Sequence, residues 1–84
     1  MDLKAICDHL RLARLALGPE HPLSSHIEMV ERHLTPGDPL FRNDAVSAET
    51  DLLAISADLE SAEVEVPPGV NEAIKQLGEA IELL

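Results

Sequence analysis

Three clusters of glycine and proline divide this sequence into four amphipathic segments, and this division limits the folds open to the chain. The clusters are Gly18-Pro19, residues 35–39 and Pro67-Pro68-Gly69. Such residues end helices, because glycine adopts left-handed backbone freely and proline lacks an amide proton. Between the clusters, apolar residues recur every three or four positions, the period of a helix that buries one face. The pattern predicts four helices, over about residues 3–17, 24–34, 48–62 and 70–84.

Capping signals suggest where these helices begin. Asp2 is suited to cap the first helix, and Ser25 with Glu28 matches an S-x-x-E capping box for the second. Ser47 is suited to cap the third helix, so residues 35–46 are predicted to form a loop.

Two short stretches allow more than one interpretation. Phe41, the only aromatic residue, lies in the predicted loop and is expected to cover one end of the core, with an exposed partner anchor as the alternative. Residues 62–66 alternate apolar and acidic side chains, which is a strand period. No second segment has this period, so a strand there would have to pair between chains. A frayed helix end or an extended linker is favoured.

The fold class that follows is all-α, with one domain over residues 1–84 built as a compact four-helix bundle or an orthogonal helical array. A core of this size leaves little net stability, and a single cysteine permits no internal disulfide. A homodimer is therefore an open alternative. Leu12 and Leu15 lie away from the apolar stripe of the first helix, which suits a central position or a contact between subunits.

Charge is distributed unevenly along the chain. Residues 1–42 carry five basic and six acidic side chains, whereas residues 43–84 carry one basic and ten acidic ones. The resulting net charge of −10 repels phosphate backbones and disfavours direct binding to nucleic acid. It is compatible with a basic protein partner, although acidic residues also simply keep small proteins soluble. Lys4, Arg11 and Arg14 cluster on the first helix and are expected to meet the acidic half, within or between subunits.

No pattern in the sequence predicts a catalytic, cofactor or metal site. Cys7 lies near a helix start, where the dipole and the neighbouring Lys4 and Arg11 would lower its pKa, but no base shares its face and a small core residue is expected. His26 and His33 are two helical turns apart, too far to share one ion. The carboxylates fall on polar faces, and the four glycines never cluster into a phosphate loop. We therefore expect a protein that is not an enzyme and that needs neither cofactor nor metal.

The chain resembles acyl carrier proteins in its length, its acidity and its number of predicted helices, but in nothing else. That family attaches its prosthetic group to the serine of an Asp-Ser-Leu motif at a helix start. Ser47 lies between Val46 and Ala48, and no Asp-Ser pair occurs in the sequence. Without this motif, a carrier or enzyme-accessory role is only a third alternative.

The N-terminal residues do not resemble a signal peptide, since Asp2 and Asp8 interrupt the apolar residues. No stretch approaches the roughly 20 apolar residues that span a bilayer, so no membrane is expected as a partner. The single cysteine fits a reducing compartment. A cytoplasmic location is expected.

Two functions are compatible with these features. The first is a non-catalytic protein–protein interaction module, a regulator, adaptor or inhibitor that docks through apolar helix faces. The alternative is a nucleic-acid mimic that occupies the basic groove of a nucleic-acid-binding protein, as in a phage or plasmid anti-defence protein. The side chains expected to contact a partner are Leu12, Leu15, Phe41, Glu72, Glu79 and Glu82.

Overall fold

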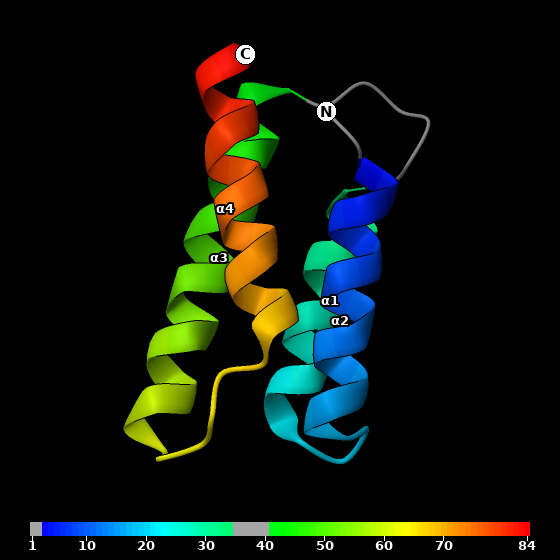
Figure 1. Ribbon diagram of the computed structural model, residues 1–84, viewed down its shortest axis with the longest axis vertical. Helices are drawn as coiled ribbons and strands as arrows, with labels where there is room; N and C mark the ends of the chain where they lie inside the picture. Colours follow the sequence, from blue (N-terminus) through cyan, green and yellow to red (C-terminus); the bar gives the residue numbers. More distant parts are fainter. Residues whose placement is uncertain (1–2, 35–40) are drawn as a thin grey trace.

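The computed structural model describes residues 3–34 and 41–84 and shows four helices in an up-and-down bundle (Figure 1). They are α1 (Leu3–Leu17), α2 (Pro22–His33), α3 (Arg42–Ser61) and α4 (Pro68–Leu83). α1 and α3 run in one direction, α2 and α4 in the other. α1 packs against α2 and α4, and α3 packs against the same two helices. The all-α prediction is confirmed, and the arrangement is a bundle rather than an orthogonal array.

One apolar stripe from each helix forms the core. These stripes follow the helical period of the sequence, so each segment buries one face and leaves the other to solvent. Burying a leucine or isoleucine completely stabilises a fold by about 1.5–3 kcal/mol relative to exposure. The largest side chains with less than 2% exposure are Ile6, Leu10, Ile27, Leu34, Leu52, Leu59, Leu77 and Val70.

α2 begins at Pro22, two residues before the expected start, and the capping-box prediction at Ser25 is wrong. His21 takes the N-cap position, where its Nδ1 accepts a hydrogen bond of 3.1 Å from the Leu23 amide. Pro22 then occupies the first turn, in which a missing amide proton leaves no helical hydrogen bond unmade. The Ser25 hydroxyl donates to the Pro22 carbonyl at 2.9 Å, inside the helix rather than at its cap.

α3 begins at Arg42, so the prediction of a loop is wrong for residues 42–46, and Ser47 is not the cap. Phe41 stands at the N-cap in an extended conformation, and its carbonyl accepts from the Ala45 amide at 3.1 Å. Ala45 is fully buried, which extends the apolar period of the helix by one turn. Phe41 itself is 64% exposed, so the prediction that it covers the core is also wrong.

The remaining start signal, Asp2, and residues 35–40 of the predicted loop lie outside the described residues.

The C-terminus of α3 is a Schellman motif with a glutamate at its left-handed position. Glu63 has a φ of 59°, and the Val64 amide donates to the Leu59 carbonyl at 2.9 Å. Beyond this turn the chain is an extended linker, in which Val64 and Val66 pack against the core. Their alternation with exposed glutamates therefore comes from a linker crossing the end of the bundle. The described part of the chain contains no strand.

α1 and α4 approach each other closely at Gly69. A Cβ atom at this position would collide with the backbone carbonyl of His9 and would lie 3.2 Å from the Ala13 Cβ. Gly78, which the sequence places beside the apolar stripe of α4, does not have this role. A Cβ atom there would meet only the Glu49 carboxylate, at 3.1 Å.

Candidate docking surfaces

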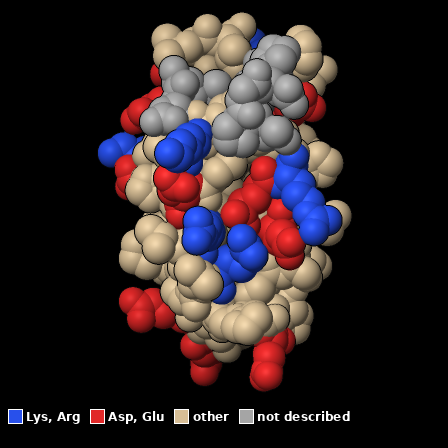
Figure 2. All heavy atoms as spheres, turned by 90° about the vertical axis from the view of Figure 1, so that its right-hand side faces the viewer, with Lys and Arg blue, Asp and Glu red and all other residues tan. Residues whose placement is uncertain are grey.

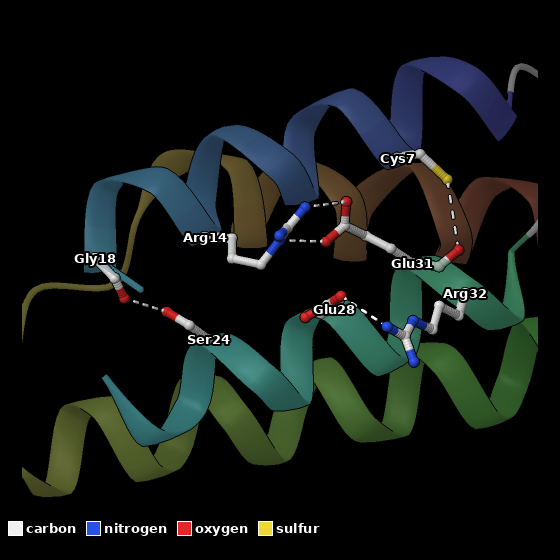
Figure 3. A network of polar contacts seen from close by, with 7 residues as sticks. All are labelled: Cys7, Arg14, Gly18, Ser24, Glu28, Glu31 and Arg32. Carbon is white, nitrogen blue, oxygen red and sulfur yellow. Dashed lines mark hydrogen bonds and ion pairs between the residues drawn. The ribbon is translucent and has the colours of Figure 1, made fainter. Parts of the chain in front are cut away.

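The seam between α1 and α2 is held by polar contacts and is structural (Figure 3). Arg14 donates to Glu31 twice, from Nε to Oε2 at 2.7 Å and from Nη2 to Oε1 at 3.2 Å. At the end of the seam the Ser24 hydroxyl donates to the Gly18 carbonyl at 2.7 Å. The Arg14 guanidinium therefore meets a carboxylate of its own half of the chain. The expectation that Arg14 would meet the acidic C-terminal half within one chain is wrong.

Cys7 belongs to the same seam and is half-buried against the core. Its thiol donates to the Leu34 carbonyl at 3.3 Å. Burial, and after it the negative charges of Glu31 and Asp8, raise the pKa of this thiol. The expected lowering of the pKa by the helix start is therefore wrong, and the thiol has the environment of a packing residue.

The raised pKa of Cys7 predicts a loss of stability in alkali. In the unfolded chain the thiol ionises near pH 8.5, whereas in the folded protein the proton is held to higher pH. Folding thus gains stability from the protonated thiol below about pH 8.5, and this gain is lost as the pH rises through the folded pKa. We expect the midpoint of urea unfolding to fall between pH 8 and pH 10 more steeply in the natural protein than in Cys7→Ser. The comparison is sensitive because the chain has no tyrosine. Parallel pH profiles of the two proteins would contradict the assignment.

The outward face of α1 exposes two large apolar side chains. Leu12 is 62% and Leu15 64% exposed. Lys4 and Arg11 are also exposed on this helix, and neither forms an ion pair within the described residues. Figure 2 shows basic groups gathered on the α1–α2 side of the molecule, next to carboxylates and uncharged surface. This face therefore combines exposed leucines with unpaired positive charge.

A groove runs between α2 and α3, the pair of neighbouring helices with the smallest contact. Its main hollow has a volume of about 290 Å³ and has Val30 and Ile55, which are 3% and 4% exposed, at its base. A second hollow of about 150 Å³ shares Val30, His33 and Asp51 with the first. The other residues that line the two hollows are His26, Met29, Asp44, Ser47, Ala48, Ala54 and Asp58.

The groove has an apolar base and an acidic wall. Asp44, Asp51 and Asp58 recur every seven residues and lie on one side of α3, and none of them forms an ion pair in the described part of the chain. His26 and His33 line the opposite side, from α2. Among residues 3–34 and 41–84, no three His, Cys, Asp or Glu side chains are grouped so that they could hold a metal ion. What the groove offers is a row of carboxylates beside apolar surface.

The other expected contact residues lie on separate parts of the bundle. Glu79 and Glu82 are exposed on α4, Glu72 on the same helix is half-buried, and Phe41 is exposed at the start of α3. The structure thus joins Leu12 with Leu15 on one helix and the three glutamates on another, rather than forming one site from all six.

The groove was not predicted from the sequence. The seven-residue spacing of Asp44, Asp51 and Asp58 did indicate that these three carboxylates share one side of a helix.

None of the helices in the described ranges is long and apolar enough to span a bilayer.

In comparisons with known proteins, no family model matches this chain, and no curated protein or solved structure matches it either.

Proposed function

We propose that this protein is a non-catalytic interaction module that docks on another protein through apolar helix faces left exposed by its own fold. The observation that carries the proposal is the exposure of Leu12 and Leu15, at 62% and 64%, on a helix whose other face fills the core. A helix that needs only one buried face gains nothing for folding from leucines on its outer face. Neighbouring large apolar side chains at a surface are a feature of interaction sites.

The rest of the surface supports the same proposal. Further large apolar side chains are exposed on α2, at the start and in the middle of α3, and at the end of α4; they are Met29, Phe41, Val46, Leu53, Leu83 and Leu84. Isolated exposed leucines are ordinary, but this number in a chain of 84 residues provides several faces for a partner.

The test is capture of a partner from native lysate with the tagged protein and with two variants, Leu12→Asp and Leu15→Asp. Each substitution removes an apolar contact and adds a charge, so we expect the affinity for the partner to fall at least about tenfold. Far-UV circular dichroism should show that both variants remain helical, because neither side chain is part of the core. Ser25→Asp is the control, since it adds the same charge at an exposed position of α2 without removing an apolar side chain.

Unchanged association of the α1 variants would contradict this proposal. A basic nucleic-acid-binding partner that is retained only at low salt, and lost when Glu72, Glu79 and Glu82 are changed to glutamine, would favour the nucleic-acid mimic instead.

A further inference from the structure

We infer that the groove between α2 and α3 binds a basic amphipathic helix of a partner protein. This inference rests on the proposed function, because it names the chemistry of a partner for a second surface of the same module. It uses three properties of the groove: its apolar base, the regular spacing of its carboxylates, and the absence of lysine and arginine among the described residues that line it.

The lining of the groove suits a helix. Val30 and Ile55 provide an apolar base, and Ala54 is a small, exposed residue on the α3 side that allows a close approach. Met29, 57% exposed, stands on the α2 side. Methionine is flexible enough to adapt to the side chains of a ligand. An amphipathic helix that lays its apolar face into such a groove is a common mode of peptide recognition.

The carboxylates of the acidic wall are spaced so that a helix lying along α3 could pair one basic side chain with each of them. Asp44, Asp51 and Asp58 are two helical turns apart along α3, which places successive residues about 10 Å from each other. A helix lying nearly along α3 with Lys or Arg every seven residues would bring one positive charge to each carboxylate.

Charge complementarity selects a basic partner over the other occupants. The three aspartates form no ion pair within the described residues, and the whole chain carries a net charge of −10. The outer face of α1 in a second copy would offer Lys4 and Arg11, only two positive charges for three carboxylates, and the net charge of −10 on each copy would oppose the approach. A nucleic acid would bring its phosphates to the wall and is repelled. A basic helix is attracted by the wall and covers the apolar base.

The experiment uses the whole protein and two synthetic helical peptides of 18 residues with the same leucine face. One peptide carries Lys at seven-residue intervals beside the leucines, and the other carries Glu at these positions. Binding is measured by fluorescence anisotropy, and NMR chemical shifts locate the bound peptide. The groove variant Asp51→Lys/Asp58→Lys is compared with Glu79→Lys/Glu82→Lys, which changes the net charge equally on the exposed face of α4.

We expect the lysine peptide to bind at least about tenfold more tightly than the glutamate peptide, with shifts confined to α2 and α3. The groove variant should weaken this binding about tenfold, and the α4 variant less than about threefold. Equal losses in the two variants, or shifts elsewhere on the bundle, would overturn the inference by showing that net charge alone attracts the peptide. Self-association that protects the groove, detected by sedimentation of the protein alone, would assign the groove to a second copy and would also overturn it.

Failure of the groove inference is distinguishable from failure of the proposed function. The peptide experiment depends on α2 and α3, whereas capture of the natural partner is tested through Leu12 and Leu15 on α1. If the lysine peptide does not bind but Leu12→Asp still abolishes capture, the interaction module stands and its partner uses another face.

Discussion

Replacing Gly69 by alanine is expected to destabilise the bundle by about 3 kcal/mol, most of the net stability of a domain of this size. The added Cβ would collide with the carbonyl of His9, and a carbonyl within a helix cannot rotate away as a side chain can. The Ala13 Cβ, 3.2 Å from the position of the added Cβ, prevents the new methyl group from shifting to that side. Relief requires α1 and α4 to separate, which would loosen the core between them. Urea unfolding followed by far-UV circular dichroism measures the loss.

Gly78→Ala is the matched control, because it makes the same substitution in the same helix. There the Cβ would meet only the Glu49 carboxylate, the free end of a flexible side chain, at 3.1 Å. Alanine has a higher helix propensity than glycine by about 1 kcal/mol, so this variant should be as stable as the natural protein or more stable. Equal losses from the two substitutions would mean that the close approach of α1 and α4 at Gly69 is not the cause.

The sequence was sufficient to predict the four helices and their buried faces, because burial repeats with the period of the helix. Leu52 and Leu77, for example, fall on the apolar period of their helices and are fully buried. Helix starts were less predictable, since several residues near each start are suitable caps. Serine was chosen at positions 25 and 47, whereas the structure uses the His21 ring for α2 and no side chain for α3. A local motif identifies a cap that is chemically suitable, but the packing of the first turn decides which residue is used.

The same distinction applies to the candidate surfaces: some can be recognised from a single helix, and others depend on which helices are neighbours. Leu12 and Leu15 were identifiable because they lie off the stripe of a single helix, and no knowledge of neighbouring helices was needed. The groove depends on α2 and α3 being neighbours. Its histidines come from one segment and its aspartates from another, so their approach could not be read from either segment alone. Gly69 is a similar case, since its role depends on the His9 carbonyl of a distant helix.

Leu52→Ala and Leu53→Ala, two substitutions one residue apart in α3, are expected to have very different effects. Leu52 is fully buried, so truncation removes apolar contacts and leaves a cavity, at a cost of about 2–5 kcal/mol. Leu53 is 51% exposed on the outer side of the same helix, and its truncation should change the free energy of unfolding by no more than about 0.5 kcal/mol. Urea unfolding of both variants under identical conditions provides the comparison.

The small effect expected at Leu53 bears on function as well as on folding. If an exposed leucine contributes almost nothing to the stability of the isolated protein, its apolar surface is available for contact with a partner, as the proposed function requires. The same reasoning applies to Leu12 and Leu15 on α1, which are more exposed than Leu53. A loss at Leu53 comparable with that at Leu52 would show instead that this side of α3 belongs to the core, and the apolar surface available for docking would shrink accordingly.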